Sequence, residues 1–441
     1  MNVWIVNHYA IPPSMGGLVR HYYFSKYLQK KGHSVKIFTS SKIHNTDINM
    51  IRDKSLYREE MEDGVEYTFV KSRDYKGNGM DRVINMMDLP FKTWKAMKRF
   101  YKKEKPDVIY TSSPDLFVAL FALLFGRKHK IPVVVEVRDL WPESIVEYNG
   151  MSRMNPIIQV LYQLEKWIYV HADQLIFTMP GGKEYICDKG WTKKVNINKV
   201  NHVNNGVDLA EFEENKKLYN LENSQIANDN AFKVVYMGSI RKVNNLQTLV
   251  DAAKELKNQD IHFYIYGDGT EKDMLEDECR KYSLNVKFEG RVEKKYIPYI
   301  LSNADLNIIN VQGAGLNKYG CSWNKLFEYM ASEKPILCNL PVNYDLIREK
   351  KLGIAKRFAN GKEYAEEITK FRQLTSEEYG EYCQRLKECA QEYDYQILTN
   401  KIERILKRQL IVQNDKFVLK RSEIVKQRSH FDENNVCIGS K

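Results

Sequence analysis

The residues best placed to do chemistry lie in one stretch in the second half of the chain, which reads Ser-Trp-Asn-Lys-Leu-Phe-Glu-Tyr-Met-Ala at 322–331. An apolar strand pattern at 305–311 precedes this stretch, and a loop with three glycines joins the two. We expect a helix to begin near Asn324 and a further strand to follow Pro335. Backbone N–H groups and the helix dipole at such a junction attract an anion. The stretch therefore predicts a site for a negatively charged ligand.

Two charged side chains make the expected ligand more specific. Lys325, at the start of the predicted helix, adds a point charge suited to phosphate. Glu328, one turn later, can accept two hydrogen bonds from a vicinal diol such as a ribose. The alternative for Glu328 is an exposed helix residue that pairs with a neighbouring cation. Phosphate and ribose together predict a nucleotide.

The elements that must position this site alternate along the whole chain. Helical patterns occur at 18–30, 116–125, 157–170, 246–256, 271–281 and 324–331. Strand patterns occur at 3–6, 35–38, 108–110, 133–137, 175–177, 234–237, 262–266, 286–288, 306–311 and 336–338. Continuous Val and Ile runs, rather than alternating ones, are typical of parallel sheets that are buried on both faces.

This order predicts an α/β protein with two doubly wound domains. A polar segment, 211–230, separates the two series of strands. Ligands of such sheets bind beyond the carboxyl ends of the strands, so we expect the site in a cleft between the domains. The predicted division is a first domain at 1–190, a second at 191–390, a helix at 391–410 and a weakly ordered basic tail at 411–441.

Length and composition limit the class of protein. A chain of 441 residues is too long for one ordinary core, and 43% apolar content is typical of a globular protein. The seven cysteines are scattered without metal-ligand spacing, which favours a reduced, cytosolic chain. We find no apolar run long enough to cross a bilayer and no signal-peptide pattern.

The net charge of +11 indicates an anionic partner: nucleic acid, a membrane surface or small substrates. The segment 91–105 combines seven Lys and Arg residues with aromatic and apolar ones at helical spacing. Such a face can lie on acidic lipid headgroups at the inner leaflet, and the alternative is an ordinary surface helix. No zinc-finger, RNP or helix-turn-helix pattern is present, so we expect no nucleic-acid partner.

Several further motifs occur in a fixed order. They are Gly16-Gly17 with Arg20-His21, the run Glu-Val-Arg-Asp-Leu-Trp-Pro-Glu-Ser at 136–144, Asn205-Gly206-Val207-Asp208, Tyr236-Met237-Gly238-Ser239, Tyr266-Gly267-Asp268-Gly269 and Gly290-Arg291-Val292. Together with the stretch 322–337, they resemble the motifs of the retaining glycosyltransferase family 4. The run 136–144 is similar to one in members that build bacterial surface polysaccharides such as O-antigen and capsule.

The resemblance implies the GT-B fold, in which two Rossmann-like domains face a central cleft and a C-terminal helix returns toward the first domain. The first domain would bind the acceptor and the second the nucleotide-sugar donor. The residues that the resemblance and the motifs assign to the donor are Gly16, Gly17, Gly238, Arg241, Lys242, Gly267, Arg291, Val292, Asn324, Lys325 and Glu328.

The chain departs from the family pattern at two places. Family members carry two glutamates eight positions apart; Glu328 matches the second, but Gly320 stands in the place of the first. Members also place an Arg and a Lys after the strand that opens the second domain, whereas Arg241 and Lys242 have a different spacing here.

A nucleoside-diphosphate leaving group gains negative charge as the glycosidic bond breaks. The chain lacks the Asp-x-Asp triplet of metal-dependent glycosyltransferases, so we expect neither a metal nor another cofactor. Lys325, Arg241 and Lys242 are then the candidates for stabilising that charge, with N–H groups from the loop at Gly16 and Gly17. The alternative for Arg241 and Lys242 is a solvated loop.

Acceptor chemistry is expected from the first domain. Asp139 follows the strand pattern 133–137, where a carboxylate could take the acceptor's proton, and Arg138 could bind an acceptor phosphate. In the alternative, the two side chains pair with each other and cap the next turn. Glu143, in the same loop, and His8, at the end of the first strand, are candidates for contacting the acceptor.

The resemblance implies a retaining hexosyltransferase, and the missing Asp-x-Asp triplet indicates that it is metal-independent. The expected donor is a UDP-linked hexosamine or deoxyhexosamine, and the expected acceptor is a polyprenyl-diphosphate-linked saccharide at the inner face of the plasma membrane. Two other functions remain open: a nucleotide-sugar 2-epimerase of the same fold, and an inactive nucleotide-sugar-binding scaffold, which the glycine at position 320 would permit.

Overall fold

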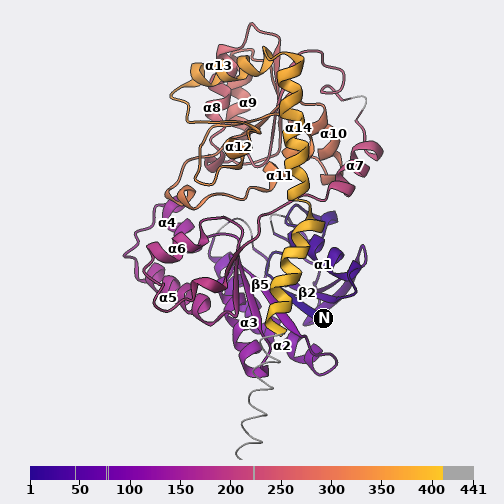
Figure 1. Ribbon diagram of the computed structural model, residues 1–441, viewed down its shortest axis with the longest axis vertical. Coiled ribbons are helices and arrows are strands. Elements are labelled where there is room, and N and C mark those ends of the chain that lie inside the picture. Colours follow the sequence, from indigo (N-terminus) through magenta and orange to yellow (C-terminus); the bar gives the residue numbers. More distant parts are fainter. Residues whose placement is uncertain (45, 76, 78, 222–223, 411–441) are drawn as a thin grey trace, which may run out of the picture.

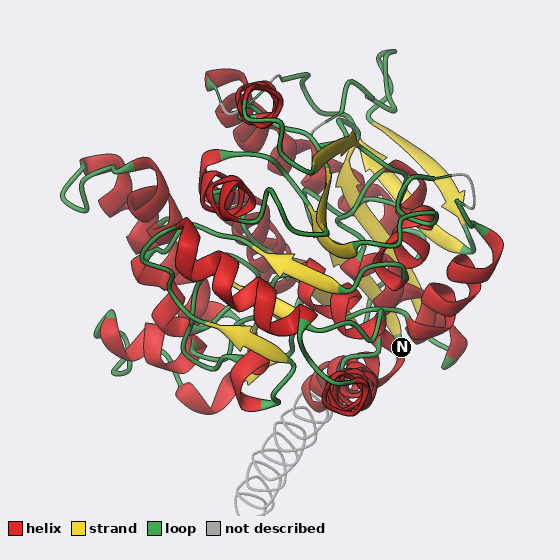
Figure 2. Cartoon of the chain, turned by 90° about the horizontal axis from the view of Figure 1, so that it is seen from above, coloured by secondary structure: helices red, strands yellow, loops and turns green. Residues whose placement is uncertain are grey.

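The computed structural model describes residues 1–410 except 45, 76, 78, 222 and 223, and the predicted basic tail at 411–441 lies outside the described residues. Two α/β domains lie one above the other (Figure 1). Each has a sheet covered by helices on both sides, as the view from above also shows (Figure 2). The predicted fold class is thereby confirmed.

The first domain contains an eight-stranded sheet of order β3-β4-β2-β1-β5-β6-β7-β8, in which only the edge strand β3 is antiparallel. Its strands are β1 (Asn2–Val6), β2 (Ser34–Ser40), β3 (Tyr57–Glu62), β4 (Val65–Val70), β5 (Val108–Ser112), β6 (Val133–Val137), β7 (Gln174–Phe177) and β8 (Val200–His202). Its helices are α1 (Arg20–Lys30), α2 (Met80–Tyr101), α3 (Leu116–His129), α4 (Glu143–Asn149), α5 (Pro156–His171) and α6 (Gly182–Asp188).

The second domain contains a six-stranded parallel sheet of order β11-β10-β9-β12-β13-β14. Its strands are β9 (Phe232–Met237), β10 (Ile261–Tyr266), β11 (Val286–Gly290), β12 (Leu306–Ile309), β13 (Ile336–Cys338) and β14 (Gly353–Ala355). Its helices are α7 (Leu209–Leu218), α8 (Gln247–Glu255), α9 (Lys272–Lys281), α10 (Ile297–Ser302), α11 (Asn324–Ala331), α12 (Leu346–Glu349), α13 (Gly361–Arg372) and α14 (Ser376–Glu392).

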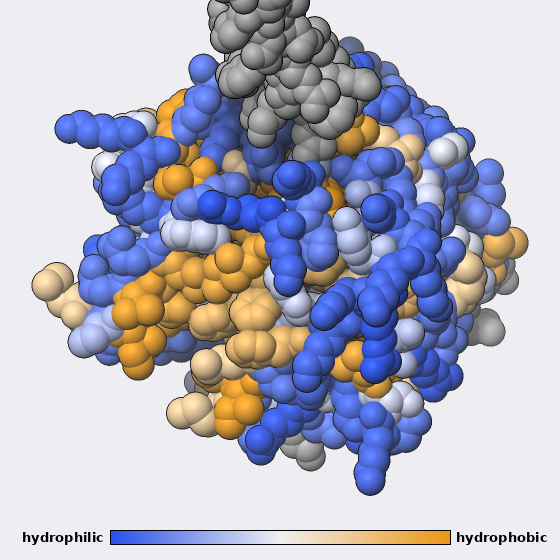
Figure 3. Space-filling model, turned by 90° about the horizontal axis from the view of Figure 1, so that it is seen from below, coloured by the Kyte–Doolittle hydropathy of each residue, from blue (hydrophilic) through white to orange (hydrophobic). Residues whose placement is uncertain are grey.

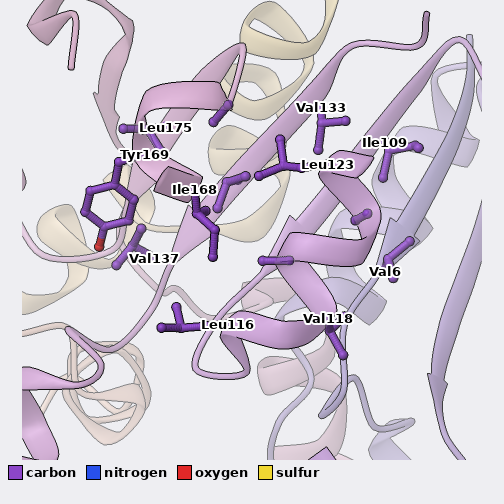
Figure 4. Packing of buried hydrophobic residues seen from close by; sticks show 14 of the residues in the cluster. Val6, Ile109, Leu116, Val118, Leu123, Val133, Val137, Ile168, Tyr169 and Leu175 are labelled. Atoms are coloured by element: carbon purple, nitrogen blue, oxygen red, sulfur yellow. The ribbon is translucent and has the colours of Figure 1, made fainter. Parts of the chain in front are cut away.

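The Val and Ile runs form the central strands of both sheets. Apolar side chains suit these strands at every position because both faces of each sheet are buried. On one face of the first sheet, α2, α3 and α5 cover a core that includes Ile109, Leu123 and Val133 (Figure 4). On the other face lie α1 and the helical segment 395–410, which contributes Leu398 and Ile402. The C-terminal segment thus crosses back to the first domain, as expected (Figure 1).

The boundary between the domains differs from the prediction. Strand β8 pairs with β7, so the first sheet extends past residue 190. The chain crosses to the second domain at 203–208, and half of the polar segment 211–230 forms helix α7. The sequence signal failed because α7 is strongly polar and β8 has only three residues. The hairpin β3–β4 and the strand β14 were not predicted either.

The interpretation of segment 91–105 as a lipid-facing amphipathic surface was wrong in its aromatic part. Met97 and Phe100 are buried in the core beneath α2, and the Trp94 ring lies 5.2 Å from that of Phe125. The apolar side of this half of α2 faces the sheet, so only its Lys and Arg side chains and Phe91 remain exposed. Within the described residues, every helix is too short or too polar to cross a bilayer.

Candidate active site

A cavity of about 530 Å³ lies between the carboxyl ends of the two sheets. Both domains contribute to its wall, as the sequence predicted. The predicted donor residues among its lining are Gly16, Gly17, Gly238, Arg241, Gly267, Arg291 and Val292. Lys242 is exposed outside this cavity, and Asn324 is exposed at the start of α11.

The floor of the second-domain side is made by two glycines at the ends of β9 and β10. Gly238 has φ +151° and Gly267 φ +136°, a region that side chains disfavour. A Cβ on Gly267 would lie 1.8 Å from the carbonyl oxygen of Gly238, and one on Gly238 would lie 2.8 Å from Lys325 Nζ. The backbone can therefore turn beneath the Lys325 ammonium only with glycine at both positions.

Lys325 is a partly buried ammonium without a carboxylate partner. Its Nζ donates to the Tyr236 hydroxyl at 3.3 Å and lies 4.4 Å from the centre of that ring. Among the described residues no Asp or Glu comes within ion-pair distance of it, and burial lowers the pKa of Lys325 to about 8. A partly buried cation without an ion-pair partner favours an anionic ligand, so this geometry fits the predicted phosphate contact.

Glu328 lies one turn along α11 from Lys325. Its Oε1 is 3.3 Å from Lys294 Nζ, and its side chain is 19% exposed. It lines a small pocket beside the main cavity, together with Tyr23 of the first domain. The predicted alternative, a pair with a neighbouring cation, is therefore present in part. A ribose at this place would share the carboxylate with Lys294.

Asp139 follows β6 on the first-domain side. It accepts a hydrogen bond from Ser144 Oγ at 3.1 Å, and burial raises the pKa of its carboxyl group although this bond opposes the rise. No ion pair joins Asp139 to Arg138 in the part of the chain that the structure describes. The Arg138 guanidinium lies within the field of the buried Glu136 instead, and burial lowers the pKa of Arg138. A carboxyl group with a raised pKa is suited to accepting a proton near neutral pH.

The comparisons with known proteins agree with this geometry. A model described as Glycosyltransferase Family 4 matches residues 15–211, and one described as Glycosyl transferases group 1 matches residues 220–393. Each domain of the chain is therefore similar to a glycosyltransferase domain. A probable glycosyltransferase of Pseudomonas aeruginosa, WbjE, is 22% identical over 268 residues, which cover 57% of this chain and 62% of that protein. The chain thus matches somewhat less than two thirds of that relative.

Solved structures of GT-B enzymes share the fold of this chain. Sucrose-phosphate synthase from Thermosynechococcus elongatus has a TM-score of 0.70 at 16% identity, covering 94% of this chain and all of the other. HepE from Anabaena in complex with UDP-glucose has a TM-score of 0.65 at 14% identity, with 92% and 100% covered. Trehalose-6-phosphate from E. coli bound with UDP-2-fluoro glucose scores 0.69 at 10% identity, with 92% and 99% covered.

The position that corresponds to the first glutamate of the family pattern, Gly320, has no room for a side chain in this structure. Gly320 has φ +82°, and a Cβ there would lie 2.9 Å from Pro180 Cδ and 3.2 Å from the carbonyl oxygen of Asn343. The preceding 3-10 turn, Gly315–Tyr319, packs on the first domain, where Tyr319 joins the core and its carbonyl accepts from the Gly181 N–H at 2.9 Å. The glycine therefore lets the loop dock between the domains.

Two predicted acceptor residues, Glu143 and His8, are buried and bind side chains that do not line the cavity. Glu143 is buried and accepts hydrogen bonds from Arg153, Tyr162 and Lys189, so it ties α4 to α5 and α6. Contact with an acceptor would require these bonds to break, so the acceptor role of Glu143 stays a prediction. His8 is 2% exposed and lies with Nδ1 2.6 Å from Asp115 Oδ2.

The sequence suggested no role for Glu136 and His44, but the structure places both in distinctive surroundings. Glu136 is fully buried in β6 and binds Arg20, Tyr110 and Ser112. A glutamate inside a Val run signals such a partner, since a buried charge must be paired. His44 lines the cavity, and burial, with Arg82 and His8 nearby, lowers its pKa to about 4.

Proposed function

We propose that the chain transfers a sugar from a nucleotide-sugar to an acceptor bound between its two domains. The observation that carries this proposal is Lys325, a partly buried ammonium without an ion-pair partner among the described residues, which lies against Gly238 in the floor of a cavity that both domains line. Such a cavity can hold a diphosphate and a sugar away from water.

The proposed donor is a UDP-sugar, a hexosamine or deoxyhexosamine. Structures of the same fold have been solved with UDP, with UDP-glucose and with UDP-2-fluoro glucose. In our proposal Lys325 and Arg241 meet the diphosphate, the backbone at Arg291 and Val292 meets the base, and Glu328 meets the ribose. Lys242 and Asn324, which are both exposed, would contribute less to binding the donor.

Transfer proceeds without a metal in this proposal. The departing UDP gains negative charge, and fixed cations and N–H dipoles in a water-poor site stabilise it. Lys325 stands on the second domain, and the loop at Gly16 and Gly17 supplies N–H groups from the first. A chelator would then leave the transfer rate unchanged.

The proposed acceptor is a saccharide on a polyprenyl diphosphate, at the inner face of the plasma membrane, in surface-polysaccharide synthesis. The motif around Asp139, which is similar to one in members that build surface polysaccharides, supports this choice. The likeness to WbjE, a probable glycosyltransferase, supports sugar transfer alone. Asp139 takes the proton of the acceptor hydroxyl, and Arg138, without an ion-pair partner in the described chain, is free to meet acceptor phosphate. The sugar keeps its anomeric configuration, as the family resemblance implies.

The test is turnover of labelled UDP-sugars with and without lipid extracts of bacterial membranes. The proposal expects a labelled lipid product only when donor and lipid are both present. Product formed from the donor alone would identify a 2-epimerase instead. Donor binding without any product, across a panel of UDP-hexosamines and native membranes, would indicate a binding scaffold.

A further inference from the structure

Three neighbouring helices of the first domain expose large apolar side chains. Helix α3 packs between α2 and α5, on the side of the sheet opposite α1. Seen from below, hydrophobic side chains gather in a broad area among hydrophilic ones (Figure 3). We call the exposed apolar residues of these three helices the apolar strip: Met80, Val83, Ile84, Met87, Phe91, Leu124, Ile157 and Val160.

The arrangement on α2 follows helical spacing. Met80, Ile84, Met87 and Phe91 recur at three- and four-residue steps and therefore share one side of the helix. Met80 is 73% and Phe91 58% exposed, although such side chains are usually buried. Phe91 also contacts α3, where its ring meets that of Phe121 at 4.7 Å. The strip thus continues from one helix to the next.

Cations border the apolar strip near the C-terminal turns of α2 and α3. The side of α2 that bears Met80 and Phe91 continues to Lys95 and Lys98, both exposed. From α3, Lys128 Nζ lies 5.8 Å from the centre of the Trp94 ring and the Arg127 guanidinium 5.9 Å from that of Trp167. The remaining exposed cations of this border are Arg99, Lys102, Lys103 and Lys105.

The acidic residues of α2 do not offset this charge. Asp88 is paired with Lys92, and Asp81 lies 3.1 Å from Arg73. Two such faces would repel each other through their basic borders, which disfavours a second copy of the chain as the occupant. Apolar side chains beside a dense cluster of cations instead match a surface that is apolar below and anionic above.

We propose that the apolar strip and its basic border dock on a bilayer that contains anionic lipids. The strip enters the region between headgroups and acyl chains, and the border contacts lipid phosphates. Helices α2 and α3 each follow a strand and so begin on the side of the first sheet that faces the cavity, although the residues that line the cavity belong to other elements. Docking along them brings the first-domain side of the cavity next to the headgroups.

This docking deepens the proposed function and rests on it in one respect: the proposed lipid-linked acceptor gives the protein a reason to bind a membrane. A lipid-linked saccharide would reach the cavity from the headgroup region without leaving the bilayer. The binding itself requires no turnover, so it can be tested separately.

The test is co-sedimentation with two kinds of vesicle, phosphatidylcholine alone and an equal mixture of phosphatidylcholine and phosphatidylglycerol. The strip variant combines Met87→Ser, Phe91→Ser and Ile157→Ser. The matched control combines Met61→Ser, Leu218→Ser and Met274→Ser, which remove apolar side chains of comparable exposure elsewhere. We expect the wild type and the control to bind the mixed vesicles and the strip variant to bind about tenfold more weakly or worse.

A charge variant, Lys95→Glu with Lys98→Glu and Lys102→Glu, should also lose binding to the mixed vesicles, and added salt should weaken the wild type. Strip and wild-type proteins that bind vesicles equally would overturn the proposal. So would a strip variant that turns a dimer into a monomer in light scattering while vesicle binding is unchanged. Thermal unfolding of each variant reports folding. Vesicle binding by a wild type that fails to bind UDP in calorimetry would remove the proposed function but keep the docking.

Discussion

Arg20 and Glu136 form a buried ion pair beside the crossing between the two domains. The Nε of Arg20 lies 2.7 Å from Glu136 Oε2, and both side chains are at most 1% exposed. The same guanidinium donates to the carbonyl oxygens of Val203 and Asn204, at the start of the crossing. Burial alone would raise the pKa of Glu136, but Arg20 and His21 hold it well below its usual range. One pair thus ties the first sheet to the chain that enters the second domain.

Removing one partner of this pair should be strongly destabilising. Arg20→Met leaves the Glu136 charge buried without its main counter-charge, and we expect a loss of about 3–5 kcal/mol in the free energy of unfolding. Urea denaturation measures it. The double variant Arg20→Met with Glu136→Leu should recover part of the loss, since it removes the orphaned charge. A single variant as stable as the wild type would contradict the account of the pair.

The affinity for UDP should depend on pH through Lys325. The pKa of this ammonium is about 8 without ligand, so the free protein loses the charge as pH rises above that value. The terminal phosphate, with a pKa of about 6, stays ionised. Calorimetry should therefore show UDP binding that is strongest near pH 7, about twofold weaker at pH 8 and up to about tenfold weaker at pH 9.

The matched control is Lys325→Arg, whose guanidinium stays charged throughout. Its UDP affinity should not change between pH 7 and 9, whatever its absolute value. The same pH dependence in both proteins would show that another group is responsible.

Asp139 should control the acid limb of the rate profile. A carboxyl group must be ionised to accept a proton, and burial raises the pKa of Asp139. As the pH decreases, the transfer rate should therefore begin to fall at a higher pH than it would with an ordinary aspartate. Ser144→Ala removes the hydrogen bond that opposes the rise, and should move this limb further up. Asp139→Asn should lower the rate about 10²–10⁴-fold while UDP binding is kept. An unshifted limb in Ser144→Ala would contradict the assignment.

Gly320 and Gly380 should respond in opposite directions to alanine. At Gly320 the positive φ and the approach of Pro180 make a side chain unfavourable, so we expect a loss of about 1–3 kcal/mol in unfolding free energy. At Gly380, inside α14 and with nothing within 4 Å of an added Cβ, alanine should stabilise by about 0.5–1 kcal/mol. Thermal unfolding of both variants tests the pair of expectations. Equal effects would show that the loop does not require its glycine.

The fold and the second-domain side of the cavity could be predicted because their signals are local. Continuous Val and Ile runs mark buried parallel strands, and Gly238 and Lys325 lie in motifs that fix the end of β9 and the start of α11. The contact between these two residues follows once the sheet forms, since both elements meet at its carboxyl edge.

The contacts that could not be predicted have a common physical cause. Each depends on which element, distant in the sequence, packs against the residue in the folded protein. Nothing near Glu143 indicates that Lys189, in the turn after α6, will bind its carboxylate. The spacing within 91–105 shows an amphipathic helix but not that the sheet lies against its aromatic side. Gly320 likewise looked like a lost glutamate, whereas the structure shows a loop pressed on Pro180.

The central claim, a nucleotide held by α11, is tested most directly by calorimetry with UDP and GDP on the wild type, Glu328→Ala and Lys294→Met. If Glu328 binds the ribose, UDP binds the wild type, and Glu328→Ala weakens it by roughly 1–3 kcal/mol. Lys294→Met, which removes only the other half of the ion pair, should leave UDP affinity unchanged or raise it. If neither nucleotide binds, or if the two variants weaken UDP equally, Glu328 serves the ion pair and the nucleotide site has been wrongly assigned.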